Sequence, residues 1–113
     1  MGQPYKPLRK LFWWLLVGSK GGRKRLMIIT ALRQAPANAN QLATKLGLNY
    51  KTVQHHLDVL MENRMVVAHG EKYNITYHLS PELLDNMDLI DSIIREAGIK
   101  VGEVREKAWD RSG

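Results

Sequence analysis

Residues 42–60 read LATKLGLNYKTVQHHLDVL, and this stretch decides the fold. Leu42 and Leu46 lie one helical turn apart, and Gly47 can adopt the left-handed conformation that ends a helix. Asn49 is then a good N-cap for a second helix. The apolar positions of that helix follow at steps of four and three residues: Val53, Leu57 and Leu60. Two short helices around a glycine turn are typical of a helix-turn-helix, whose second helix enters the major groove of duplex DNA.

The second helix, expected over about residues 49–63, has an outward face of polar side chains. Its apolar positions share one face at about 100° per residue, so the other positions point away from the core. Gln pairs with adenine, Lys with guanine or phosphate, and Thr contacts a thymine methyl group. Such side chains also occur on ordinary solvated helices, and the turn spacing favours the DNA interpretation. The outward positions are Lys51, Gln54, His55 and Asp58, with Tyr50 and Thr52 near the helix start.

The charge is divided unequally along the chain. Residues 1–57 contain ten Lys or Arg and no acidic residue, whereas residues 58–113 contain seven basic and eleven acidic residues. A half without carboxylates repels no phosphate, and its cations can displace counterions from a polyanion. Solubility or an acidic protein partner would explain the same imbalance.

Length and composition limit the class of protein. The 113 residues, 44% of them hydrophobic, suit one folded domain over residues 1–113. The absence of cysteine excludes disulfides, thiolate metal sites and cysteine nucleophiles. The apolar run at residues 11–17 is far shorter than the roughly 20 residues that span a bilayer. No convincing signal-peptide cleavage site follows it, so we expect a cytoplasmic protein without a membrane contact.

The N-terminal part predicts an arm and two helices. Residues 1–7 contain two prolines and are expected to form a loose arm. An apolar helix follows at residues 8–17, and the glycines of residues 18–22 end it. The next helix is expected from Arg23 to about Gln34, and Asn40 is the expected N-cap of the helix after it.

The C-terminal part predicts a hairpin and a further helix. Residues 65–69 and 75–79 read as strands around a turn at residues 70–74, with apolar and polar positions alternating in the second strand. Ser80 and Pro81 start a helix that Gly98 ends. The tail, residues 99–113, is expected to be either a short helix bearing Trp109 or disordered. The predicted fold class is mainly α with a small β-hairpin (α+β). It is a winged helix-turn-helix core over residues 22–80, with additional helices at 8–17 and 81–98.

The pattern Leu42-Ala-x-x-Leu-Gly-Leu-x-x-x-Thr-Val-x-His-His-Leu-x-x-Leu60 resembles the ArsR-type winged-helix regulators. It is more similar still to archaeal winged-helix proteins with a Trp-Trp helix and a Gly-Gly basic loop. The resemblance covers about residues 8–80 and is specific over 40–60. It implies a homodimeric transcription regulator that binds double-stranded DNA and pairs through its terminal helices. The implied DNA contacts from the second helix of the motif are Tyr50, Lys51, Thr52, Gln54 and His55.

The sequence departs from that family at two points. ArsR-type sensors usually bind metal through cysteines, and this chain has none. The predicted wing carries Lys72 beside Glu71, where many relatives have arginines, so its contacts are expected from Lys72 and Tyr73, with His69 as a further candidate. The loop before the first core helix supplies the other expected phosphate contacts: Lys20, Arg23, Lys24 and Arg25.

The tryptophan-rich first helix has three interpretations: a dimer seam, a membrane contact, or a lid on the core of one chain. Aromatic residues are enriched at the centres of interfaces, and a membrane-surface helix needs a clean polar face, so we favour the dimer. Two-fold symmetry predicts a pseudo-palindromic DNA site. The expected dimer contacts are Leu11, Phe12, Trp14, Leu15, Leu83, Met87, Ile90 and Ile94.

No catalytic residue, metal site or cofactor is expected. His55 and His56 diverge by about 100° on a helix, with His55 outward and His56 packed. His69 and His78 can face each other across the hairpin, yet two ligands make an incomplete metal site. No phosphate-binding loop is present, and Asp85, Asp88 and Asp91 read as a solvated helix face.

Three functions therefore stay open, and the protein is not expected to be an enzyme. The leading one is a sequence-specific, dimeric transcription regulator, whose effector the sequence does not identify. The alternative is a winged-helix protein-interaction module of a larger transcription or replication assembly, with only non-specific nucleic-acid binding. A general chromatin or RNA binder ranks last, because no arginine-glycine repeat or exposed aromatic sheet is present.

Overall fold

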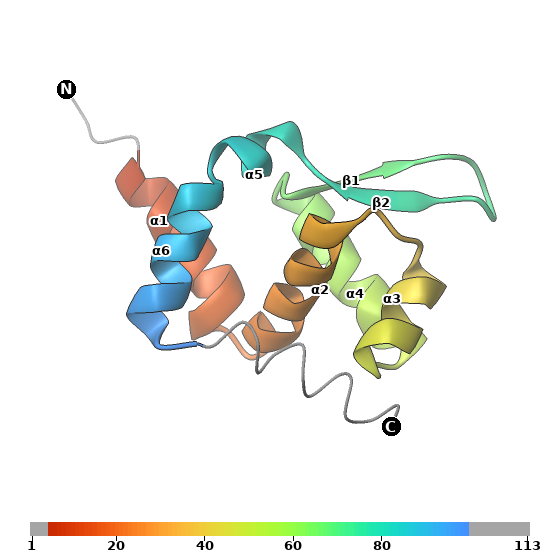
Figure 1. Cartoon of the computed structure of the whole chain (residues 1–113), viewed down its shortest axis with the longest axis horizontal. Helices are drawn as coiled ribbons and strands as arrows, with labels where there is room; N and C mark the ends of the chain where they lie inside the picture. Colours follow the sequence, from red (N-terminus) through yellow and green to blue (C-terminus); the bar gives the residue numbers. More distant parts are fainter. Residues whose placement is uncertain (1–4, 100–113) are drawn as a thin grey trace.

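The computed structural model describes residues 5–99 and confirms the predicted fold class, a mainly helical chain with one hairpin (Figure 1). The predicted tail beyond residue 99, including Trp109, and residues 1–4 of the predicted arm lie outside the described part. The prediction of an arm at residues 5–7 was wrong, because the first helix begins at Tyr5 and includes Pro7 in its first turn, where a missing N–H costs no hydrogen bond. No helix in the described part is long and apolar enough to cross a membrane. In chain order the elements are α1 (Tyr5–Trp13), the π-helical turn η1 (Trp14–Gly18), α2 (Gly22–Gln34), α3 (Ala39–Leu46), α4 (Tyr50–Glu62), β1 (Val66–His69), β2 (Thr76–Leu79), α5 (Pro81–Asp85) and α6 (Met87–Ala97).

Helices α3 and α4 form the predicted helix-turn-helix. Gly47 ends α3 in the left-handed conformation, with φ of 66°, and the Asn49 side chain accepts a hydrogen bond from the Lys51 amide at 2.8 Å. The expected cap of α3 was wrong. Asn38, not Asn40, caps this helix, because its side chain and that of Gln41 each accept the other's backbone N–H, at 2.7 and 2.8 Å. This reciprocal capping box fixes where α3 begins.

The hairpin is antiparallel, with Val66 opposite Leu79 and His69 opposite Thr76. The predicted alternation is confirmed, since Tyr77 and Leu79 are buried and the two residues beside them on β2 are half-buried. The loop before α3 extends the pairing. The Ala37 amide donates to the Tyr77 carbonyl at 3.2 Å, and the Tyr77 amide donates to the Ala37 carbonyl at 2.8 Å. The wing is therefore attached to the start of the helix-turn-helix.

Helices α2 and α4 pack together and carry the centre of the core. On α4 the three predicted inward positions are fully buried, and on α2 every residue from Arg25 to Leu32 is buried. Burying such side chains is the main favourable contribution to folding. The core side chains of the two helices include Leu26, Ile28, Ile29, Leu32, Val53, Leu57 and Leu60.

The terminal helices α1 and α6 lie side by side against this core (Figure 1). The single helix expected over 81–98 is interrupted at Asn86, whose φ of −114° and ψ of 22° are not helical. Asp91 does not simply belong to a solvated face, because it forms an ion pair with Arg33 of α2 at 2.8 Å. Arg9 of α1 forms a second ion pair, with Glu96 of α6. These contacts join the terminal layer to itself and to α2.

Most of the expected dimer residues are buried inside the single chain. Their burial is complete without a second copy, which places them in the hydrophobic core of one protomer. Leu11 and Trp14 keep exposed side chains, with 37% and 59% of their surface accessible, and Met87 is half-buried. The five that the core already covers are Phe12, Leu15, Leu83, Ile90 and Ile94.

Candidate nucleic-acid interface

The outward face of α4 keeps most of its polar side chains accessible. Tyr50 is 48% exposed at the first position of the helix, and Lys51 and His55 are also exposed. Thr52 and Gln54 are half-buried, and Gln54 lies against the wing. Because Asn49 caps the helix, the first turn of α4 is well defined, and this turn is the part of such helices that contacts bases.

Gln54 is held by the wing. Its Nε2 donates a hydrogen bond to the Tyr77 hydroxyl at 3.2 Å, which joins α4 to β2. Tyr77 is 4% exposed, and its backbone is paired with Ala37, so its ring is fixed in place. This contact restricts the rotamers of Gln54. A side chain held in one rotamer loses less entropy when it binds a base.

A polar groove of 320 Å³ lies between the start of α3, the outer side of α4 and the wing. None of the residues that line it is acidic. The sequence did not point to Asn38, Asn40 or Tyr77 as neighbours of α4. An Asn-x-x-Gln capping pattern was visible at residues 38–41, but nothing local indicated that the Tyr77 hydroxyl reaches the helix. The lining residues are Asn38, Ala39, Asn40, Tyr50, Gln54, Lys72, Tyr73, Ile75 and Tyr77.

The basic loop expected at residues 20–25 is only partly a loop, because Arg23, Lys24 and Arg25 lie in the first turn of α2, and this segment has both exposed and buried cations. Lys20, Arg23 and Lys24 are exposed. Arg25 is buried instead, so the prediction that it contacts phosphate was wrong. It is 5% exposed, and its Nε donates to the Leu15 carbonyl at 2.8 Å. Its Nη2 donates to the Ser19 hydroxyl, so the guanidinium closes the end of the turn η1.

Arg25 also reaches the inner side of α4. Its Nη1 lies 3.2 Å from Nδ1 of His56, which therefore acts as an acceptor. His56 is 6% exposed, and burial, together with the charge of Arg25, lowers its pKa to about 4. It is therefore neutral near pH 7. The prediction that His56 is packed and hydrogen-bonded while His55 faces outward is confirmed.

Two glycines allow the loop to approach α4 and η1 closely. A Cβ on Gly22 would lie 2.6 Å from the Leu16 carbonyl carbon, a distance that real Cβ atoms do not show. A Cβ on Gly21 would collide with the His56 ring and the Arg25 guanidinium. The Gly-Gly pair thus does more than interrupt a helix, because it leaves room for this segment to pack against η1 at Gly22 and against His56 of α4 at Gly21.

The wing tip is exposed and bent by residues with positive φ. Gly70 has φ of 111°, and Lys72 adopts the left-handed conformation with φ of 52°. Tyr73 is 96% exposed beside it. His69 and His78 meet edge to face across the hairpin, with ring centroids 4.7 Å apart. Among residues 5–99, no group of three or more His, Cys, Asp or Glu side chains is arranged to hold a metal ion.

Comparison with known proteins agrees with this geometry. Residues 23–67, from the first turn of α2 to the second residue of β1, match the family described as "Bacterial regulatory protein, arsR family". No curated protein matches the chain. The resemblance inferred from the sequence is confirmed over this segment, and a helix-turn-helix of this family indicates a DNA-binding transcription regulator.

Proposed function

We propose that this chain, whose residues 23–67 carry an arsR-type helix-turn-helix, is a sequence-specific transcription regulator that binds double-stranded DNA as a homodimer. It acts in the cytoplasm, α4 enters the major groove, and the hairpin serves as the wing. The observation that carries the proposal is the polar outer face of α4: its first two turns, the polar groove beside them and the exposed cations Lys20, Arg23 and Lys24 contain no acidic side chain. Such a surface suits duplex DNA, because its cations can bind phosphates and its polar side chains can hydrogen-bond to base edges.

The proposed contacts fall into two groups. Gln54 and Lys51 face base edges, because Gln and Lys side chains in the first turns of such a helix reach adenine and guanine. Tyr50, Thr52 and His55 flank them on the same helix. Phosphates are bound from both sides, by the exposed loop cations and by the wing tip: Lys20, Arg23, Lys24, Lys72 and Tyr73.

The proposed dimer interface consists of apolar side chains that stay exposed on α1 and η1. Leu11 and Trp14 are large apolar side chains that stay exposed in the single chain, with half-buried Met87 as the remaining expected contact. An exposed tryptophan is the kind of anchor that dominates interface energies. Two-fold pairing would place two copies of α4 about 34 Å apart, which corresponds to half-sites one DNA turn apart.

Substitutions on α4 test the DNA contacts. We expect Gln54→Ala to relax the preference at one base pair, with about 1–3 kcal/mol less discrimination there. Lys51→Ala should weaken binding more evenly across sequences. Lys10→Ala, on the exposed side of α1, is the matched control and should leave both properties unchanged. Selection of binding sites from a random duplex library measures the preference, and an unchanged preferred sequence for Gln54→Ala would contradict direct readout by that residue.

The dimer is tested by sedimentation. We expect the wild-type chain to sediment as a dimer at micromolar concentration, and Trp14→Lys to sediment as a monomer with the same thermal unfolding midpoint. Trp14 is exposed, so its replacement should not disturb the core. A monomeric wild type would contradict the homodimer.

The poorly charged wing favours a second candidate function. Lys72 is its one lysine or arginine between Ala68 and His78, and Glu71 stands next to it. A protein-interaction module of a larger transcription or replication assembly would need few wing cations. Stable co-purification with a protein partner, together with DNA binding that is blind to sequence, would favour this function over the regulator.

A further inference from the structure

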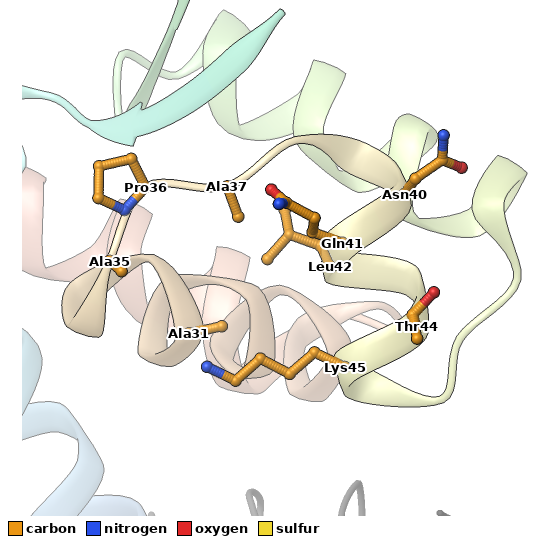
Figure 2. Close-up of a pocket in the computed structure, with 9 residues that line it drawn as sticks. All are labelled: Ala31, Ala35, Pro36, Ala37, Asn40, Gln41, Leu42, Thr44 and Lys45. Atoms are coloured by element: carbon orange, nitrogen blue, oxygen red, sulfur yellow. The ribbon is translucent and has the colours of Figure 1, made fainter.

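A second and larger groove lies away from the outer face of α4. It has a volume of 610 Å³ and runs between the end of α2, the loop of residues 35–37 and α3 (Figure 2). Pockets of about 300–1,000 Å³ accommodate small organic ligands. Its lining residues are Ala31, Ala35, Pro36, Ala37, Asn40, Gln41, Leu42, Thr44 and Lys45.

The chemistry of this lining is apolar with one positive charge. Small side chains of alanine and proline form one wall, and the lining contains no acidic residue. Figure 2 shows the Lys45 side chain extended along the groove toward α2. Its Nζ donates to the neutral Gln34 amide oxygen at 3.4 Å, and it joins no ion pair among the described side chains. A small apolar molecule with one carboxylate complements such a groove in shape and charge.

The groove is connected to the candidate interface through its Ala37 wall. Ala37 is paired in both directions with the backbone of Tyr77, and the Tyr77 hydroxyl accepts the hydrogen bond from Gln54. A ligand that moves the loop of residues 35–37 therefore acts on the residue that holds Gln54. Such a link makes ligand occupancy and the orientation of Gln54 thermodynamically coupled.

We propose that the groove between α2 and α3 binds a small apolar carboxylic acid, and that binding changes the orientation of Gln54 through Ala37 and Tyr77. Binding of the ligand to the groove does not depend on the proposed function. The effect of ligand binding on DNA affinity rests on the proposed function.

The test is a titration of the ¹⁵N-labelled, DNA-free protein with 4-phenylbutyrate, and in parallel with the neutral 4-phenylbutanamide, followed by NMR. We expect saturable shifts at Ala31, Ala37 and Lys45, and about tenfold weaker binding of the amide, because a charge-assisted hydrogen bond is lost. Lys45→Gln should remove the difference between the two probes. Lys10→Gln, an exposed lysine on α1, should preserve it.

Three results would overturn the binding step. These are equal affinity for acid and amide in the wild-type chain, shifts scattered away from the groove, or concentration-dependent shifts at the groove without probe. The last would mean that a second copy of the chain occupies it.

A separate measurement tests the coupling between ligand binding and the orientation of Gln54. We expect 4-phenylbutyrate to shift the Gln54 side-chain amide signals in the wild type but not in Tyr77→Phe, which lacks the hydroxyl and keeps the backbone pairing with Ala37. Unmoved Gln54 signals at saturation would overturn the coupling. Because no DNA is present, this result is separate from the proposed function. If the Gln54 signals move while no duplex is bound specifically, the proposed function fails and the ligand site stands.

Discussion

Charged side chains form ion pairs in the layer of α1 and α6, but they lie exposed at the start of α2 beside α4. In the layer of α1 and α6, Arg9 is paired with Glu96, and Asp91 is paired with Arg33 of α2. At the start of α2, beside α4, Lys20, Arg23 and Lys24 are exposed, and none of them joins an ion pair among the described side chains. Paired charges join helices to each other, whereas exposed cations outside ion pairs form a surface suited to a polyanion.

The same contrast separates two neighbouring arginines. Arg23 and Arg25 stand two positions apart at the start of α2, and Arg23 is exposed while Arg25 is 5% exposed. Arg25 uses its donors on the Leu15 carbonyl, the Ser19 hydroxyl and His56. One arginine is thus available to an external partner, and the other holds η1 and α4 together.

The largest effect is expected at Arg25. Arg25→Ala leaves the buried Leu15 carbonyl and His56 Nδ1 without a donor, and each such loss costs about 1–3 kcal/mol. We expect the free energy of unfolding to fall by about 3 kcal/mol in urea titrations. Arg23→Ala is the matched control and should change stability by less than about 0.5 kcal/mol while weakening DNA binding. If both variants unfolded alike, the division between scaffold and surface would be wrong.

The next effect depends on pH. Burial and the charge of Arg25 lower the pKa of His56 to about 4 in the folded chain, against about 6.5 when it is unfolded. Between these values the unfolded chain binds more protons, so the free energy of unfolding should be full above pH 6.5 and fall toward pH 4, by at most about 3 kcal/mol.

The His56→Gln variant isolates this contribution. The Asp91 carboxyl, whose pKa the Arg33 guanidinium lowers, also loses stabilisation in acid, but it does so in both proteins. We therefore expect the difference in stability between wild type and His56→Gln to change between pH 6.5 and 4. A difference that is constant over that range would show that His56 titrates normally.

The salt dependence of DNA affinity should also distinguish the start of α2 from α1, although the expected effect is smaller. Each phosphate contact contributes about −0.9 to the slope of log K against log salt for duplex DNA. Lys24→Gln on the basic loop should reduce the slope by about 0.9, and Lys10→Gln on α1 should leave it unchanged. Anisotropy titrations over a salt series measure both. Equal slopes for the two variants would mean that the loop does not contact phosphate.

The smallest effect on the free energy of unfolding is expected for the ion pair between α2 and α6. Arg33 and Asp91 are 44% and 35% exposed, and exposed ion pairs contribute about 0–1 kcal/mol. Asp91→Asn should therefore lower the free energy of unfolding by less than about 1 kcal/mol and leave DNA affinity unchanged. A loss of several kcal/mol would show that this pair, rather than the apolar core, joins α6 to α2.

Local signals predicted much of the fold. The glycine turn at Gly47, the Asn49 cap and the alternation of β2 are encoded by neighbouring residues, and the structure confirms them. The place of Arg25 was missed although a signal existed. Arg25, Ile29 and Leu32 follow at steps of four and three, which puts the arginine on the apolar face of α2.

Other features had no local signal. The contact between Gln54 and Tyr77 joins residues 23 positions apart, and it depends on how the hairpin packs against α4. The break at Asn86 falls within an apolar stripe that continues across it at steps of four, three and four residues, with no proline or glycine to mark the break. The stripe consists of Leu83, Met87, Ile90 and Ile94. Burial of the stripe within one chain also depends on tertiary packing, which periodicity alone does not reveal.

The central claim is that the outer face of α4 recognises a particular DNA sequence. Its most direct test is fluorescence anisotropy of the wild-type chain with a duplex selected from a random library and with a scrambled duplex of equal composition, at about 150 mM salt. We predict a preference of at least ~10³ for the selected duplex that persists at this salt concentration. Equal affinity for the two duplexes, falling steeply as salt rises, would contradict the claim and leave the basic half as a non-specific electrostatic surface.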